Sequence, residues 1–291
     1  MTGKERLFLF SILLIAMLLL PLTLKAASEE EMVQQFLAKN DAVKKRTMVA
    51  PFFSFSYGKV DPAGYHNFTG ETNKYVRMVN STDATALASI HRITSFEGGL
   101  SLLVDRGLLS AAFDYWLTVG SSKKGDFEFY TDLTAGTHED VEDFNLRSEI
   151  KVWGVYLDYQ YFIHNPPVPY FGIRGLSAKA GAGIGYYGAY WDLWEGFAGF
   201  IEGTDEYYVL TDHLKGSGPG FHLSAGIEYP AWKGLILAAD AKYVWLKFDK
   251  LSKQMTETYE LYLVNSDTHQ PIDIDFSGPR LNLSIKHYFT L

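Results

Sequence analysis

The chain has 291 residues, of which 47% are hydrophobic, 26 are glycine and none is cysteine, and its formal net charge is −8. The lack of cysteine excludes disulfide scaffolds, cysteine-ligated zinc, iron–sulfur clusters and thiol catalysis. The negative charge, without a basic stripe, argues against a nucleic-acid partner, because binding phosphates requires clustered cations. Mean hydropathy is only −0.06 although 15% of the residues are aromatic, so apolar residues must be interleaved with polar ones.

The N-terminus has the pattern of a secretory signal peptide. Lys4 and Arg6 precede an apolar stretch over residues 7–20, and small residues follow from Ala26. A basic region, an apolar region and a small-residue cleavage site in this order are typical of exported proteins. We predict a signal peptide over residues 1–26, with an uncleaved membrane anchor as the alternative.

Residues 27–47 predict a short helix on the periplasmic side of the membrane. Ser28 and Glu31 have the spacing of a capping box, and basic residues from Lys44 onward suit the negative end of the helix dipole. The apolar positions form one modest stripe, so we expect this helix to lie against the membrane or the mouth of the domain that follows, with a plug inside that domain as the alternative.

From Ala50 onward apolar and polar residues alternate with a period of two. Because successive side chains of a strand face opposite sides, this alternation predicts strands with one apolar and one polar face. The pattern gives eight principal strands. They fall near residues 53–58, 96–104, 109–119, 144–163, 170–191, 221–229, 235–248 and 280–291.

The long strand over 144–163 carries a change of pattern in its middle. Its apolar set begins only after Trp153 and Gly154, and a charged set including Arg147 and Lys151 precedes it. We predict a β-bulge at this point, which would turn the charged set toward the interior.

The connections between the strands alternate between short turns and long polar segments. The short turns are 105–107, 164–169 and 230–234, and the long segments are 61–88, 121–143, 192–218 and 249–275. Short periplasmic turns and long extracellular loops are typical of outer-membrane barrels. We predict an all-β fold, a transmembrane antiparallel up-and-down β-barrel over 48–291 in the bacterial outer membrane. Eight strands are expected, or ten if one long segment holds an extra hairpin.

Particular segments add a family resemblance to this pattern. Pro-Tyr-Phe-Gly at 169–172 leads into Gly-Ala-Gly-Ile-Gly-Tyr at 181–186, and the last strand reaches an aromatic residue at Phe289. Over 48–291 the chain resembles the eight-stranded outer-membrane barrels that include OmpA, OmpX and OmpW. The resemblance implies membership of a superfamily of adhesins, structural anchors, small-solute or hydrophobic-compound channels and a few enzymes. The fold does not choose among these functions.

The strand faces opposite the apolar residues carry charges of both signs. An eight-stranded barrel is just wide enough for side chains to fill it, so charges inside must pair or stay hydrated. We expect either a salt-bridged core or a narrow hydrated path for small solutes. The predicted inward set is Glu97, Asp114, Arg147, Glu149, Lys151, Asp158, Lys179, Glu228, Asp240, Lys242, Arg280 and Lys286.

The third long segment holds an apolar cluster in a region predicted to be extracellular. Exposed apolar clusters often mark a surface for a ligand or partner. The alternative is that these side chains pack against other loops or belong to strands extended above the membrane. The candidate residues are Trp191, Trp194, Phe197, Phe200 and Ile201.

No histidine pair has a metal-site spacing, so we predict no metal centre and no cofactor. The acidic run from His138 to Asp143 could bind divalent cations near lipopolysaccharide, and the alternative is a solvated loop. The enzymatic alternative is an omptin-like protease or a lipid A-modifying enzyme. Its candidate groups are the acidic pair Asp126 and Glu128 and the pair Asp212 and His213.

The predicted function is therefore a non-enzymatic outer-membrane barrel, with a surface or structural role or with permeation of small or hydrophobic solutes. The predicted partners are outer-membrane lipid and lipopolysaccharide, and at the loops a small hydrophobic solute or an extracellular partner.

Overall fold

The computed structural model describes residues 47–290 except for short gaps. The gaps are 80–86, 133–136, 165–175, 195–197, 201–206, 210–211, 233–234, 257–258 and 266–267. The predicted signal peptide lies outside the described residues, and so does the predicted N-terminal helix apart from Thr47 at the start of the first strand.

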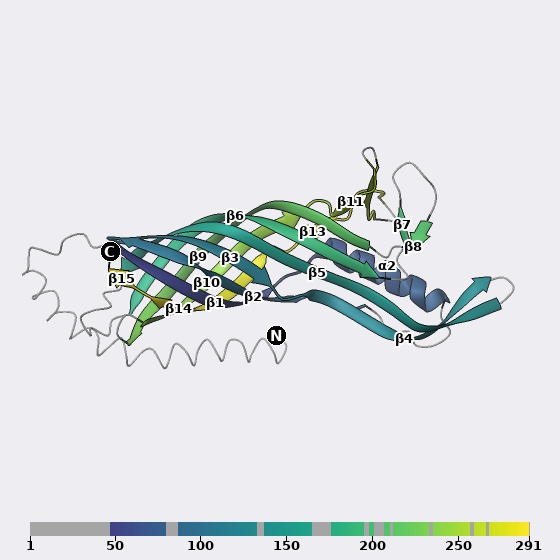
Figure 1. Ribbon diagram of the computed structural model, residues 1–291, viewed down its shortest axis with the longest axis horizontal. Helices are drawn as coiled ribbons and strands as arrows, with labels where there is room; N and C mark the ends of the chain where they lie inside the picture. The colour runs from purple at the N-terminus through teal and green to yellow at the C-terminus, as the bar shows by residue number, and fades with distance from the viewer. Residues whose placement is uncertain are drawn as a thin grey trace, which may run out of the picture.

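Eight long antiparallel strands, each of which we call a wall, close into a barrel (Figure 1). The walls are β1 (Thr47–Lys59), β2 (Arg92–Val104), β3 (Gly107–Trp116), β5 (Thr137–His164), β6 (Ser177–Trp194), β9 (Asp212–Trp232), β10 (Leu235–Phe248) and β14 (Gly278–His287). Each wall pairs with the next, and β14 pairs with both β10 and β1, which closes the ring. The predicted barrel with eight strands is confirmed.

The remaining elements lie mainly at one end of the barrel. They are α2 (Ala63–Val79), β4 (Val119–Asp132), β7 (Ala198–Phe200), β8 (Tyr207–Val209), β11 (Ser252–Gln254), β12 (Glu260–Tyr262), β13 (Ile274–Asp275) and, at the other end, β15 (Phe289–Thr290). β4 continues the β3 wall, because both pair with β5. The long segments thus extend existing walls or fold above them, and ten strands are not needed.

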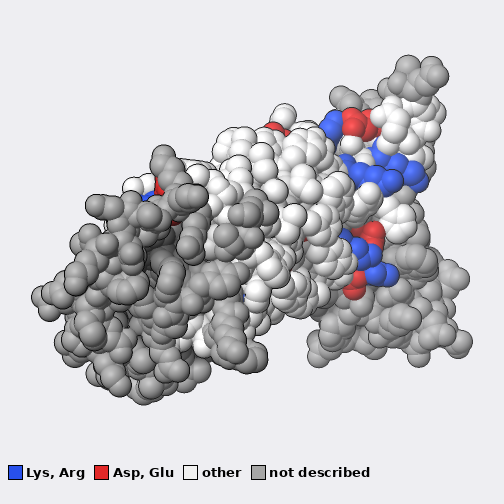
Figure 2. Space-filling model, turned by 60° about the vertical axis from the view of Figure 1, so that its left-hand side comes forward, with Lys and Arg blue, Asp and Glu red and all other residues white. Residues whose placement is uncertain are grey.

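The outer face of the barrel is apolar over its middle. Phe53, Leu100, Val155, Leu223 and Leu283 come from five different walls, and each is between 52% and 58% exposed. In Figure 2 the visible middle of the barrel is almost entirely white, and most charged side chains lie toward its ends. A closed barrel with such a band satisfies its backbone internally and presents hydrocarbon to lipid, as a membrane-spanning barrel must. Within the described residues, no helix is long and apolar enough to cross a membrane.

Aromatic side chains mark the upper edge of this band. Tyr57, Tyr115, Trp153, Tyr243 and Trp245 all point outward and are 39–44% exposed. Such rings sit at membrane interfaces, where one part of the side chain is apolar and the other wet. Because short turns face the periplasm in outer-membrane barrels, we assign the end that carries α2 to the extracellular side.

The predicted bulge in the long strand is absent. β5 and β6 pair in unbroken register from Arg147 to Phe162, and the first shift lies beyond Phe162. The charged residues Arg147, Glu149 and Lys151 therefore share the outer face with Val155, and the prediction that they point inward is wrong. The outer face changes from apolar to charged where the strand leaves the membrane, and the sequence shows the same change of pattern that a bulge would give.

The barrel interior has three layers. An apolar periplasmic cluster contains Met48, Ala50, Leu103, Leu108, Phe162, Ile236 and Tyr288. A polar layer follows in the middle of the barrel. A larger apolar extracellular cluster lies above it and includes Tyr65, Phe68, Ile93, Trp116, Ile150, Tyr187, Trp191, Leu246, Leu261, Ile274 and Phe276. The two apolar clusters therefore bracket a polar centre.

Helix α2 covers the extracellular mouth, within a segment predicted only as a polar loop. The helix begins just after Pro62, whose fixed φ and missing N–H suit a helix start. Tyr65 and Phe68 lie on the buried face, and their rings lie 5.6 and 5.0 Å from the ring of Trp191. We call α2 and segment 249–277 together the cap, because both contribute side chains to the extracellular cluster.

Candidate functional site

The polar layer of the lumen contains nine of the twelve residues predicted to point inward. All nine are at most 9% exposed, and they come from seven different walls. They are Glu97, Asp114, Asp158, Lys179, Glu228, Asp240, Lys242, Arg280 and Lys286. The alternation of side chains along the strands gave the correct face for all nine. None of them lies on the part of β5 that extends above the membrane and carries charges on its outer face.

Glu97 is the centre of the upper half of this layer. Lys242 donates to its carboxylate at 2.9 Å, the hydroxyl of Tyr156 donates at 2.6 Å, and the amide of Asn282 donates at 2.7 Å. Three donors from three other walls thus satisfy one buried carboxylate, which offsets part of the large cost of removing it from water.

Asp114 and Arg280 form the second pair of the upper half. The guanidinium of Arg280 lies 3.6 Å from Asp114 and stacks over the ring of Trp116 at 4.3 Å. The indole N–H of Trp116 donates to the same carboxylate at 2.8 Å. Trp116 also belongs to the extracellular cluster, so it joins the polar layer to the apolar layer above it.

The lower half of the polar layer alternates cations and carboxylates. Lys179 lies 3.0 Å from both Glu228 and Asp240, and Lys286 donates to Glu228 at 2.8 Å. The hydroxyl of Tyr288 also donates to Glu228, at 3.2 Å. Glu228 and Lys179 have almost no exposed side-chain surface, so this half is closed as well as paired.

Residues outside the predicted set complete the network. His222 lies 2.8 Å from Asp158, and Gln160 accepts from Lys179 at 2.8 Å and donates to Ser224 at 3.0 Å. They point inward on the same alternation as the predicted charges. The predicted set contained only charged residues, although the strand positions of these polar side chains also place them inside.

Glycines on β6 make room for these side chains. An added Cβ at Gly183 would lie 2.3 Å from the ring of His222, and one at Gly181 would lie 2.2 Å from the backbone oxygen of Tyr159 and 2.7 Å from the side chain of Gln160. β6 therefore has no side chain at the positions where bulky side chains of the neighbouring strands fill the lumen. The interior is filled by fitted side chains and is not an open channel of uniform bore.

The first residue of the predicted ligand loop is buried and is not part of an exposed apolar cluster. Trp191 is only 1% exposed, because it points into the extracellular cluster and its indole donates to the hydroxyl of Ser148 at 2.9 Å. It belongs to a strand extended above the membrane, which was the alternative left open by the sequence. The side chains of Trp194, Phe197, Phe200 and Ile201 lie outside the described part of the structure.

A cleft of about 450 Å³ lies on the outer wall just above the aromatic band. Its lining consists of Lys151, Tyr190, Asp192, His213, Lys215 and Lys253. Lys151 donates to Asp192 at 2.7 Å, and the ammonium of Lys215 lies 5.5 Å from the ring of Tyr190. Figure 2 shows charged side chains gathered at this end of the wall. Three lysines facing one carboxylate give the cleft a positive charge.

In the structure His213, a residue of the enzymatic alternative, contacts Asp192. His213 stands opposite Asp192 across the β6–β9 pair, and its Nδ1 lies 2.6 Å from Asp192 Oδ1. The sequence pointed to Asp212 beside His213, but neighbours along a strand face opposite sides. The side chains of Asp212, Asp126 and Glu128, and those of the acidic run from 138 to 143, lie outside the described set.

One group of side chains suited to a metal ion occurs among the described residues. Asp61, His66 and His91 bring their ligand atoms within 4.8 Å of one another at the start of α2. The spacing of histidines along the sequence did not indicate this group, because the chain makes a long excursion between His66 and His91.

Comparison with known proteins gives structural neighbours only. No protein-family model matches the sequence, and no curated protein matches it. The crystal structure of Neisserial surface protein A is similar with a TM-score of 0.39 at 10% identity, covering 84% of this chain and 97% of that chain. OprG from Pseudomonas aeruginosa is similar with a TM-score of 0.41 at 10% identity, covering 85% and 97%. Ail of Yersinia pestis is similar with a TM-score of 0.35 at 10% identity, covering 85% and 100%. These likenesses concern the fold, which the strand pairing establishes by itself.

Proposed function

We propose that the protein is a bacterial outer-membrane barrel with a non-enzymatic surface role, closed to the passage of ions and presenting a folded cap outside the cell. The observation that carries the proposal is the filled lumen, in which paired charges lie between two apolar clusters. A solute crossing the polar layer would have to separate buried ion pairs, and losing one partner of such a pair costs about 3–5 kcal/mol.

Passage of a hydrophobic solute through the wall is less well supported. A lateral exit needs a break in the pairing of neighbouring strands within the membrane. At membrane depth β2 and β3 pair from Ser95 to Val104, and β5 and β6 pair without a shift from Arg147 to Phe162. The continuous pairing of these neighbours favours a wall that is closed between them.

Conductance across a planar lipid bilayer tests the proposal. We expect no discrete current steps from the refolded full-length protein at high salt. The variant with both Glu97→Ala and Lys242→Ala is the matched control, because it removes the central pair of the upper half and widens the lumen. Reproducible ohmic steps from the unmodified protein would show that the lumen conducts and would refute a closed barrel.

The basic cleft supports a second element of the proposal, contact with the phosphates of outer-leaflet lipopolysaccharide. The cleft lies on the outer wall next to the aromatic band, at the height where lipid headgroups meet the barrel, and Lys151, Lys215 and Lys253 line it. We expect Lys215→Glu to weaken binding to lipopolysaccharide vesicles. Lys59→Glu, on β1 across the barrel, is the matched control and should bind as the unmodified protein does.

The enzymatic alternative rests on the contact of His213 with Asp192 in this cleft. Incubating the protein with labelled lipid A and with labelled peptides tests it. We expect no turnover. Turnover that His213→Ala abolishes would replace the non-enzymatic role with a hydrolytic one.

A further inference from the structure

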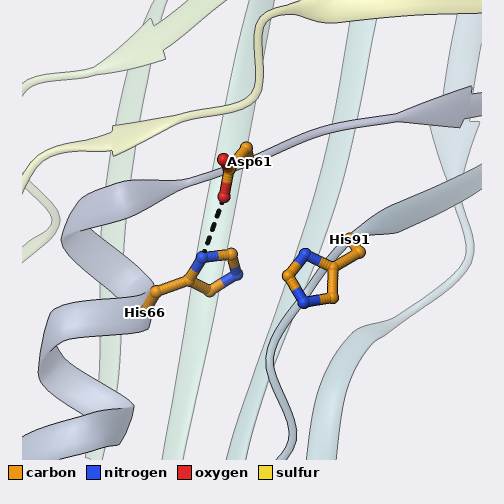
Figure 3. Close-up of side chains that lie close together, drawn as sticks. All are labelled: Asp61, His66 and His91. Atoms are coloured by element: carbon orange, nitrogen blue, oxygen red, sulfur yellow. Dashed lines mark ion pairs between the residues drawn. The ribbon is translucent and has the colours of Figure 1, made fainter. Parts of the chain in front are cut away.

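Three side chains from separate segments meet beside the start of α2 (Figure 3). Asp61 follows the end of β1, His66 lies in the first turn of α2, and His91 immediately precedes β2. Their ligand atoms all lie within 4.8 Å of one another, and the rings of His66 and His91 are 4.9 Å apart. The two ends of the first extracellular segment and its helix therefore converge at one point.

The hydrogen bonds of His66 determine which ring nitrogen is available. Nε2 lies 2.8 Å from the carbonyl oxygen of Ile90, which can only accept, so Nε2 carries a hydrogen. Nδ1 then faces Oδ1 of Asp61 at 3.0 Å. In a neutral ring Nδ1 holds a lone pair, and a lone pair opposite a carboxylate is unfavourable unless a proton or a cation lies between them.

The geometry points to a binding site for a divalent transition-metal ion, with Nδ1 of His66, a carboxylate oxygen of Asp61 and one ring nitrogen of His91 as ligands. A proton on Nδ1 would bridge only His66 and Asp61, and it would leave the positively charged ring of His66 close to His91. A metal ion uses all three groups. The bond from Nε2 to a backbone carbonyl is the support that metal-binding histidines usually have.

The distances fit such an ion. Bonds of about 2.0–2.2 Å to nitrogen and oxygen place neighbouring ligand atoms about 2.9 Å apart at right angles and about 3.3 Å apart in a tetrahedron. The 3.0 Å between His66 and Asp61 falls between these values. His91 is exposed and lies outside the regular strand, so its side chain can turn to close the remaining separation.

The ligand set favours zinc over calcium or magnesium. Two imidazoles and one carboxylate suit zinc and its neighbours in the first transition series, whereas calcium and magnesium prefer oxygen ligands. The Asp61 side chain is 81% exposed and that of His66 is 18% exposed, so water can complete the coordination. The site would therefore exchange metal with the medium outside the cell.

Binding at this site would control the cap. Metal joining Asp61, His66 and His91 would tie the start of α2 to the two strands on which the first extracellular segment begins and ends. Zinc in the medium would then hold the helix over the mouth. This regulation is separate from the closed lumen, which does not depend on the three residues.

Calorimetric titration of the metal-depleted, refolded full-length protein with zinc chloride tests the site. We expect one strongest site per chain, unaffected by a hundredfold excess of magnesium chloride. His91→Ala should weaken it by at least about 100-fold, because losing even an outer partner of a ligand costs 10–100-fold. Asp61→Asn should also weaken it. His164→Ala, at the periplasmic end of β5, is the matched control and should leave it unchanged.

Limited trypsin digestion gives a readout independent of affinity. Zinc should slow cleavage within residues 60–91 in the unmodified protein and in His164→Ala, but not in His91→Ala. Since His91 lies outside the strands and the helix, this variant should fold normally. Identical titrations of His91→Ala and the unmodified protein, or equal cleavage with and without zinc, would overturn the proposal. Either result would leave the conductance test of the closed lumen unaffected.

Discussion

The membrane half and the extracellular half of the barrel solve the same packing problem with opposite chemistry. In the membrane half the middle of the lumen holds paired charges above the apolar periplasmic cluster, and the outward apolar side chains face lipid. In the extracellular half the outer wall is charged, and the interior is apolar beneath α2. The solvent outside each half accounts for the difference. A strand exposed to lipid has only its inner face for polar residues, whereas a strand exposed to water can bury its apolar face in the ordinary way.

The two halves should therefore respond differently to substitution. A change in the polar layer removes one member of a pair that spans the barrel, so its effect should reach every wall. A change in the extracellular half should loosen the cap and leave the transmembrane walls closed.

Removing a lumen cation should have the largest effect. Lys242→Ala leaves the buried carboxylate of Glu97 without its cation, and we expect a loss of about 3–5 kcal/mol in the free energy of unfolding. Urea unfolding in detergent micelles, followed by tryptophan fluorescence, measures it. The double variant Glu97→Gln with Lys242→Met should recover most of the loss, because no unpaired charge remains. A single variant as stable as the unmodified protein would show that water reaches this carboxylate.

Truncating the main contact of the helix should have a large but local effect. Trp191→Ala removes the ring against which Tyr65 and Phe68 pack, and we expect the docked cap to lose about 3 kcal/mol. Faster trypsin cleavage within 60–91, with the unfolding midpoint of the barrel unchanged, is the expected result. Trp245→Ala, on the outer wall, is the matched control. Equal protection of the helix in both variants would mean that α2 is not held by Trp191.

Two glycines of the same helix should respond in opposite directions. A Cβ at Gly64 would lie 2.0 Å from the carbonyl oxygen of Asp273, so Gly64→Ala should push α2 away from the mouth at a cost of about 1–3 kcal/mol. A Cβ at Gly70 meets nothing within 4 Å, so Gly70→Ala should stabilise the helix by up to about 1 kcal/mol. Circular dichroism and proteolysis rates measure both. The same sign for both variants would refute the close contact at Gly64.

The docked cap should also weaken in alkali. Burial raises the pKa of Tyr65 from 10.0 to about 12. Because the docked ring holds its proton more tightly than the undocked ring, docking keeps its full stability below pH 10 and loses it as the pH rises toward 12. Cleavage of the helix by an alkali-tolerant protease should accelerate over this range. In Tyr65→Phe the acceleration should be much weaker, although that variant also loses the hydrogen bond to Ser148.

The transmembrane fold could be predicted from the sequence because lipid imposes a strict alternation. Each wall needs apolar residues on one face only, so the period of two is visible at Phe53 to Tyr57 and again in the later strands. Most of the lumen charges were found by the same rule. The same alternation also holds at Arg147, Glu149 and Lys151, and the error there was the predicted bulge: the strand enters water and its outer face becomes charged without any change of phase.

The cap could not be predicted, because it depends on contacts between distant parts of the chain. Tyr65 and Phe68 are two apolar residues in a polar segment, and their partner Trp191 lies on β6. The cluster of Asp61, His66 and His91 likewise exists only when the first extracellular segment is closed. Local spacing carries no signal for either arrangement.

The polar layer also has a consequence for how the protein assembles. Its partners are far apart in the chain: Glu97 and Lys242 are 145 residues apart, Glu97 and Asn282 are 185 apart, and the bonded hydroxyls of Ser54 and Ser284 are 230 apart. A partly inserted sheet would hold these groups without partners in a region poor in water, which is costly. We therefore expect β1 and β14 to pair before water leaves the lumen during insertion. An incompletely closed barrel would be disfavoured, because the charges that are paired in the closed barrel would lack their partners.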